Sequence, residues 1–312
     1  MYGSSRVPTA IKKIAVVMLC ALLPVTLLAS PLAEAASVPT LLYDYQFIGA
    51  NGTVVNSAPS GVPAPLTLSG NWQPVPDGVQ FSGNTTGEWS VAYGRPTSGD
   101  TLNEPPTVTV GFGSEFTYQA PANGTCFADT PNITQIGRYH VHDSQAKIQL
   151  SSCSTSRANV MVECRFSGSL TPPGTPPVVS TLPLISGDTY VATCMKSPDR
   201  RNNTAAITLS VTDLGAAKGE KKVVDTFTVA AIGYMQSTQY ISAGNKYPLP
   251  LPDNNTDQFN GIVTNAAFCA GASAEVSTCL SANLSAGAGW RRGWWGGLRS
   301  VGLQVPVVGL AP

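Results

Sequence analysis

The residues able to do acid–base or metal chemistry are few in this sequence. The only two histidines, His140 and His142, stand two positions apart, so on a strand they would lie on one face and could bind a metal ion. No third ligand accompanies them and the cysteines form no C-x-x-C pair, so a zinc site is not expected. We interpret the pair as the polar end of a strand and keep both histidines as candidate ligand-binding residues.

Patterns that mark a catalytic site are missing from the sequence as well. Many glycoside hydrolases carry paired carboxylates on one strand, in a pattern such as E-x-D-x-x-E, and no such pattern occurs here. The G-x-S-x-G motif of serine hydrolases is absent, and Gly111-Phe112-Gly113 lacks the lysine that follows in a phosphate-binding loop. The sequence therefore favours a protein without catalytic residues. The alternative is a hydrolase whose carboxylates come together from distant strands.

Three aromatic residues could form a surface for a sugar ring. Trp72 and Trp89 have flat faces of the kind that stack on the C–H face of a pyranose, and Tyr93 follows four residues after Trp89. Glu88 stands beside Trp89 and could bind sugar hydroxyls. The alternative is that both tryptophans pack in the core or at its rim. Trp72, Trp89 and Tyr93 are therefore candidate ligand-binding residues, and none is expected to be catalytic.

The elements that must position these residues are predicted to be strands. Ala146, Ile148 and Leu150 alternate with Lys147 and Gln149, and this period of two recurs along the chain between frequent Gly and Pro residues. Such a pattern predicts antiparallel sheets, each with one buried face. One short helix is expected near the C-terminus, over residues 272–284, with Ser273 as its cap. Charged residues make up only 12% of the chain and the net charge is zero, which argues against a nucleic-acid partner.

The start of the chain has the parts of a secretory signal. Basic residues precede an apolar run over residues 14–28, and the small-x-small sequence Ala33-Glu34-Ala35 follows. We expect a signal peptide over residues 1–36 and a secreted protein, since the apolar run is shorter than the about 20 residues that span a membrane. A membrane anchor is the alternative, and no later segment is long and apolar enough to cross a membrane.

Disulfides are expected in an exported chain with six cysteines outside the signal. Six cysteines allow 15 pairings. We expect the sequential set, because each pair would join neighbouring strands or close a short loop: Cys126–Cys153, Cys164–Cys194 and Cys269–Cys279. We expect one domain over residues 37–284. A Gly-, Trp- and Arg-rich tail over residues 285–312 is expected to lie outside it; the alternative is a tail that binds an anionic membrane or wall polymer.

Several segments, taken in order, resemble one family of domains. A first strand with aromatic residues leads to "NSA" and "LSG" stretches, then to a "GV-F-G" strand, and a late strand that contains F-N-G-I closes the series. These segments are residues 42–47, 56–58, 66–70, 78–83 and 257–263, with a further strand at 184–192 that begins L-I-S-G and ends V-A. Over about residues 41–284 the chain resembles secreted, bacterial laminin-G-like domains of the concanavalin A-like kind. The resemblance implies an all-β, antiparallel, two-sheet jelly-roll β-sandwich.

The same resemblance implies a function, with two departures from the family pattern. Thr264 and Asn265 stand where the family often has acidic residues, and no run of Asp or Asn has calcium-loop spacing. No cofactor is therefore expected, although some members of the family bind calcium. The resemblance implies a non-catalytic module that binds carbohydrate or a surface polymer. The alternative is a structural or envelope-associated protein with a protein partner.

Overall fold

A computed structural model gives the structure of the protein. It describes residues 40–59, 64–83, 88–97, 99–121, 130–138, 143–151, 159–199, 204–215, 221–247 and 257–284. The expected signal peptide and C-terminal tail lie outside these residues. So do His140, His142, Cys126 and Cys153.

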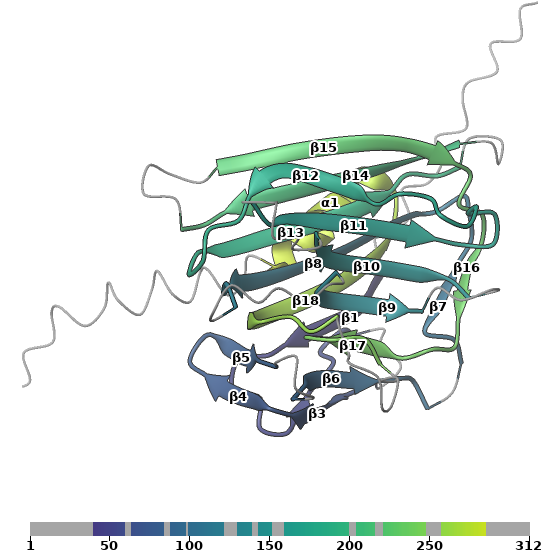
Figure 1. Ribbon diagram of the computed structural model, residues 1–312. Coiled ribbons are helices and arrows are strands. Elements are labelled where there is room, and N and C mark those ends of the chain that lie inside the picture. Colours follow the sequence, from purple (N-terminus) through teal and green to yellow (C-terminus); the bar gives the residue numbers. More distant parts are fainter. Residues whose placement is uncertain are drawn as a thin grey trace, which may run out of the picture. The chain divides into compact units, whose positions relative to one another are not determined.

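Two antiparallel sheets of eight strands each make up the fold (Figure 1). Sheet A has the order β15-β14-β13-β8-β18-β5-β4, with β1 also paired to β18. Its strands are β1 (Thr40–Gln46), β4 (Trp72–Val75), β5 (Gly78–Phe81), β8 (Thr109–Tyr118), β13 (Thr189–Lys196), β14 (Thr204–Asp213), β15 (Lys221–Ala230) and β18 (Gly261–Gly271).

Sheet B has the order β12-β11-β10-β9-β17-β6-β3-β2. Its strands are β2 (Thr53–Val54), β3 (Leu66–Gly70), β6 (Ser90–Gly94), β9 (Asn132–Gly137), β10 (Gln145–Leu150), β11 (Met161–Ser167), β12 (Val178–Pro183) and β17 (Ile241–Ala243). A separate pair of short strands joins β7 (Leu102–Glu104) to β16 (Met235–Ser237).

The core lies between the two sheets and follows from the alternation in the sequence. Phe112 and Phe116 of β8 are buried on one side, and Ile148 of β10 and Phe166 of β11 are buried in the same hydrophobic cluster. The chain passes from β8 in sheet A to β9–β12 in sheet B, returns to β13–β15, and then adds β17 and β18 to opposite sheets. The expected all-β, two-sheet jelly-roll sandwich with antiparallel strands is confirmed.

A disulfide crosses this core. Cys164 on β11 of sheet B is bonded to Cys194 on β13 of sheet A, and their Cα atoms are 6.1 Å apart. Both residues are fully buried within the hydrophobic cluster between the sheets. The expected pairing of these two cysteines is confirmed.

The single helix of the described residues, α1 (Ser273–Leu284), covers the outer face of sheet A. Gly111 and Gly113 of β8 make room for it, because a Cβ atom on Gly111 would lie 2.4 Å from Val276 and one on Gly113 would lie 2.3 Å from Leu284. The expected disulfide between Cys269 and Cys279 is confirmed and ties the helix to β18.

The two ends of α1 are held by polar contacts with the sheet beneath it. Ser273, expected as a cap, shares a hydrogen bond of 2.9 Å with the hydroxyl of Thr109. The side-chain amide of Asn265, which stands where the resembled family often has an acid, donates to the carbonyl of Leu284 at 3.1 Å. Asn265 therefore has a structural role at the end of the helix.

Candidate functional site

The strand register places a row of polar side chains across sheet B. Lys147 on β10 lies opposite Arg165 on β11 and Gln135 on β9. Gln135 in turn lies opposite Ser242 on β17, and Ser242 lies opposite Tyr93 on β6. Residues opposite each other in antiparallel strands point to the same face. Because the alternate residues of these strands fill the core, the row lies on the face of sheet B that points away from sheet A.

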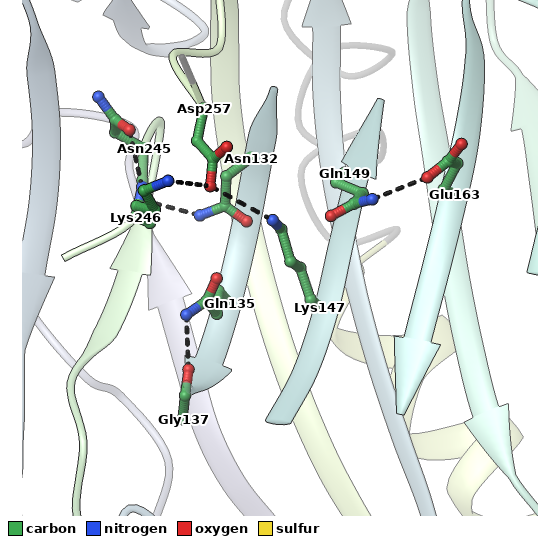
Figure 2. Close-up of polar contacts among 9 residues, drawn as sticks. All are labelled: Asn132, Gln135, Gly137, Lys147, Gln149, Glu163, Asn245, Lys246 and Asp257. Atoms are coloured by element: carbon green, nitrogen blue, oxygen red, sulfur yellow. Dashed lines mark hydrogen bonds and ion pairs between the residues drawn. The ribbon is translucent and has the colours of Figure 1, made fainter. Parts of the chain in front are cut away.

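This outer face is buried, which is unusual for the polar side of an antiparallel sheet. The exposed fraction is 8% for Lys147 and 1% for both Gln135 and Ser242. Gln149 and Glu163 form a second buried pair beside the row, where the Gln149 amide donates to the Glu163 carboxylate at 2.7 Å (Figure 2). Burying polar and charged groups costs free energy unless partners compensate. Such a concentration of them marks this face as a candidate site.

Two lysines meet at one carboxylate beside the start of β9 (Figure 2). The Nζ atoms of Lys147 and Lys246 lie 3.6 Å and 3.2 Å from the same oxygen, Oδ2 of Asp257. The backbone fixes this acid next to β9, because the amide of Asn132 donates to the Asp257 carbonyl at 2.8 Å. The Asn132 side chain also donates to the carbonyl of Asn245 at 2.8 Å. Asn132, at the start of β9, thereby holds both the segment that follows β17 and the segment that precedes β18.

Three buried polar atoms on the same face have no hydrogen-bond partner among the described residues. They are Oδ1 of Asn132, Oγ of Ser242 and Nε of Arg165. Buried polar atoms in folded proteins nearly always have a partner, so a group of unsatisfied ones on one face needs an explanation. A carboxamide oxygen, a hydroxyl and a guanidinium together can accept from and donate to a polyhydroxylated ligand.

An aromatic cluster adjoins the polar row at Tyr93. The rings of Tyr93 and Tyr247 stack with centroids 3.8 Å apart, and Tyr240 meets Tyr247 edge to face at 4.6 Å. Arg95 lies over the Tyr240 ring, 5.3 Å from its centroid. Burial raises the pKa of Tyr247, and its hydrogen bond with Tyr93 raises it further. Like that of any tyrosine, the Tyr247 phenol is protonated near neutral pH and carries an O–H donor.

The candidate aromatic residues from the sequence are not brought together. Tyr93 lies at the site. Trp72 lies on β4 of sheet A, opposite Phe81, and packs half-buried against the core. Trp89 is half-buried where β3 and β6 meet, and its carbonyl accepts a hydrogen bond from the amide of Asn71. Neither tryptophan contributes a ring to the cluster around Tyr93.

Sequence reasoning missed the partners of Tyr93, which are Tyr240 and Tyr247. They flank β17, a strand of only three residues that gives almost no periodic signal. Within the described residues, no group of three or more His, Cys, Asp or Glu residues could hold a metal ion. No helix in those same stretches is long and apolar enough to cross a membrane.

Comparison with known proteins adds only distant similarities. No model of a known protein family matches the sequence, and no curated protein matches it. Among solved structures, the binding domain of botulinum neurotoxin serotype D/C matches with 10% identity and a TM-score of 0.41. That match covers 78% of this chain and 52% of the toxin domain, so this chain spans about half of it.

Two other solved structures are similar at the same distant level. An endo-1,3-β-glucanase from Streptomyces sioyaensis has 12% identity and a TM-score of 0.42, with 75% of this chain and 97% of the glucanase covered. Peanut lectin has 11% identity and a TM-score of 0.35, with 66% of this chain and 90% of the lectin covered. The function must therefore be inferred from the geometry of the site itself.

Proposed function

We propose that the protein is a secreted, non-catalytic module of the laminin-G-like kind that binds carbohydrate on the outer face of sheet B. The observation that carries the proposal is the stack of Tyr93 on Tyr247, two rings that are only partly buried and lie on this face with Tyr240 beside them. A sugar offers an apolar C–H face and a ring of hydroxyls. Aromatic rings fit the first, and amides, hydroxyls and charged groups fit the second.

Export is part of the proposal and rests on the disulfides and the leader. Cys164–Cys194 and Cys269–Cys279 are bonds of a kind that persist in oxidising compartments outside the cytosol. We propose that residues 1–36 are removed as a signal peptide, that residues 37–284 form the binding domain, and that residues 285–312 are a tail outside it. N-terminal sequencing of the exported protein would check the cleavage site.

The test of binding uses the full chain with its disulfides formed. Calorimetric titration against a panel of neutral and acidic polysaccharides should give saturable binding to at least one of them. Size-exclusion chromatography of the polysaccharide after incubation should show no shortening of its chains. Shortening would contradict the non-catalytic assignment. If none of the polysaccharides binds, the result would instead favour a structural or envelope-associated protein with a protein partner.

A pair of tyrosine variants locates the binding. Tyr247→Ala removes the ring that stacks on Tyr93 and should weaken binding about 10-fold or more, since burying one such ring against a ligand contributes on the order of 1.5 kcal/mol. Tyr234→Ala is the matched control, because Tyr234 is 38% exposed and lies outside the cluster. Equal affinity for the two variants would place the site elsewhere.

A further inference from the structure

The outer face of sheet A is only partly covered by α1. The helix packs on β8 and β18, where Gly111 and Gly113 make room for it. Beside the helix, the outer faces of β13, β14 and β15 form the floor of a groove of about 440 Å³, and α1 forms its wall. This volume lies within the range of about 300–1,000 Å³ that is typical of ligand sites. We call it the helix groove; it lies on the opposite side of the sandwich from the tyrosine cluster.

The floor of the helix groove combines apolar, hydroxyl and cationic side chains. Thr193 of β13, Ser210 of β14 and Val224 of β15 lie opposite one another and point to the same face. Val224 is 55% exposed, so an apolar side chain on this floor is open to solvent. Met195, half-buried, follows Thr193 on the same face of β13, and Lys222, exposed, precedes Val224 on the same face of β15.

These groups together suit the indole ring of tryptophan. A methionine sulfur makes favourable contacts with aromatic rings, and the ammonium of a lysine is attracted to the face of an indole. A serine or threonine hydroxyl can accept a hydrogen bond from the indole N–H. Three tryptophans follow α1 in the sequence, Trp290, Trp294 and Trp295.

The end of α1 brings the following chain to the helix groove. Leu284 is the last residue of the helix and also lines the groove. Residues 285–312 follow it and lie outside the described residues. Trp290 stands six positions after Leu284, and an extended chain of that length spans about 20 Å. Two strand spacings, from β13 to β15, amount to about 10 Å, so the tryptophans can reach across the floor.

We infer that the helix groove is the docking site of the chain's own C-terminal segment, residues 285–312, with tryptophan rings against the floor beside α1. A tethered segment binds at an effective concentration of about millimolar, so contacts of modest strength suffice. Docking covers the exposed side chain of Val224 and leaves the outer face of sheet B open for a ligand. The inference does not depend on the proposed carbohydrate function.

The first experiment asks whether the tryptophans cover the floor. Hydroxyl-radical footprinting with mass spectrometry measures the oxidation of Met195 in the full, oxidised chain, with Met161 of β11, which is half-buried in sheet B, as the internal reference. A variant with Trp290, Trp294 and Trp295 all changed to serine should oxidise several-fold faster at Met195 and at an unchanged rate at Met161. Equal oxidation of Met195 in wild type and variant would overturn the inference.

A second variant changes the floor and leaves the C-terminal segment intact. Val224→Lys places a charge on the floor and should speed oxidation of Trp290, Trp294 and Trp295 several-fold. The matched control is Thr228→Lys, at an exposed position on the same face of β15 that does not line the groove, and it should leave these rates unchanged. Thermal unfolding shows whether each variant folds. Equal rates in the two variants would place the segment elsewhere.

A dilution series distinguishes docking within one chain from docking between two copies. Light scattering gives the mass of the wild-type protein at each concentration, and footprinting gives the protection of Met195. Protection that stays constant in the monomer supports docking of the chain's own segment. Protection that disappears on dilution would show that a second copy supplies the segment and would overturn the assignment.

Discussion

Cys164 and Cys194 are bonded across the core and join β11, next to the edge strand of sheet B, to β13 of sheet A. They lie 30 residues apart in the sequence, whereas Cys269 and Cys279, which hold α1 on sheet A, lie 10 apart. A disulfide stabilises mainly by restricting the unfolded chain, and the effect grows with the loop that it closes. The inter-sheet bond should therefore contribute more to stability than the bond at the helix.

Replacing both members of each pair by alanine tests this order. Cys164→Ala with Cys194→Ala should lower the free energy of unfolding by about 3 to 4 kcal/mol, and Cys269→Ala with Cys279→Ala by about 2 to 3 kcal/mol. Urea denaturation of the oxidised proteins measures both. A larger loss at the helix would show that α1 contributes more to the fold than loop closure indicates.

The close contact between Gly111 and Val276 predicts a cost for any side chain at position 111. Gly111→Ala should destabilise the protein by about 1–3 kcal/mol, because its Cβ atom would meet the stiff Val276 side chain at 2.4 Å and force α1 away from β8. Adding Val276→Ala should recover part of the loss. In a double-mutant cycle measured by thermal unfolding, additive effects of the two changes would contradict this contact.

Glu104 gives the stability a dependence on pH. Burial raises the pKa of this carboxyl from 4.5 to about 7, while the nearby Lys196 lowers it in part. Because the pKa is raised in the folded state, the contribution of Glu104 is fully present below pH 4.5 and is lost as pH rises towards about 7. The urea midpoint should therefore fall across this window.

Glu104→Gln should flatten that fall, since glutamine does not titrate. The wild-type and variant proteins are compared by urea denaturation at intervals between pH 4.5 and pH 8. As the pH rises, the urea midpoint of the variant should increase relative to that of the wild type, so the comparison favours the variant most at pH 8. Parallel curves for the two proteins would rule out Glu104 as the source.

Asp257 should be more sensitive to substitution than either of its lysine partners. Asp257→Asn leaves Lys147 and Lys246 without their shared carboxylate and should cost about 3 kcal/mol of stability, as expected when one partner of a buried ion pair is removed. Lys246→Gln should cost about 1 kcal/mol or less, because its side chain is more exposed and Asp257 keeps Lys147. Equal losses in chemical denaturation would mean that the two lysines do not depend on the same acid.

Trp72 and Tyr93 should differ in what their substitution affects. Trp72→Phe reduces packing against the core and should lower the unfolding temperature without changing affinity for the polysaccharide. Tyr93→Ala should weaken binding, because Tyr93 stacks on Tyr247 at the site. Calorimetric titration and thermal unfolding of both variants separate the two roles. Loss of binding in Trp72→Phe would show that Trp72 belongs to the binding site.

The local sequence pattern was enough to predict the sandwich but not the character of its outer face. The alternation over residues 145–150 predicted that Lys147 and Gln149 lie opposite the core, and they do. It also predicted one buried face for each sheet, whereas every residue of β10 is buried. Burial of the polar face depends on parts of the chain distant in sequence, so alternation within one strand carries no information about it.

The tyrosine cluster could not be predicted from the sequence for a similar reason. Tyr93 was selected for its closeness to Trp89 in the sequence, yet its ring partners, Tyr240 and Tyr247, come from about 150 residues later. They meet only because β6 pairs with β17, a long-range pairing that a three-residue strand does not reveal. The sequential disulfide Cys164–Cys194, in contrast, was predictable because few residues separate the strands that it joins.

The measurement that tests the central claim most directly is the reactivity of the tyrosines with and without polysaccharide. Hydroxyl-radical footprinting with mass spectrometry follows Tyr93, Tyr240 and Tyr247 on the full, oxidised chain, with Tyr234 as the internal reference. A saturating polysaccharide should slow modification of the first three several-fold and leave Tyr234 unchanged, because only the cluster would be covered. Unchanged reactivity at all three, under conditions where calorimetry shows saturation, would contradict a carbohydrate site on the outer face of sheet B.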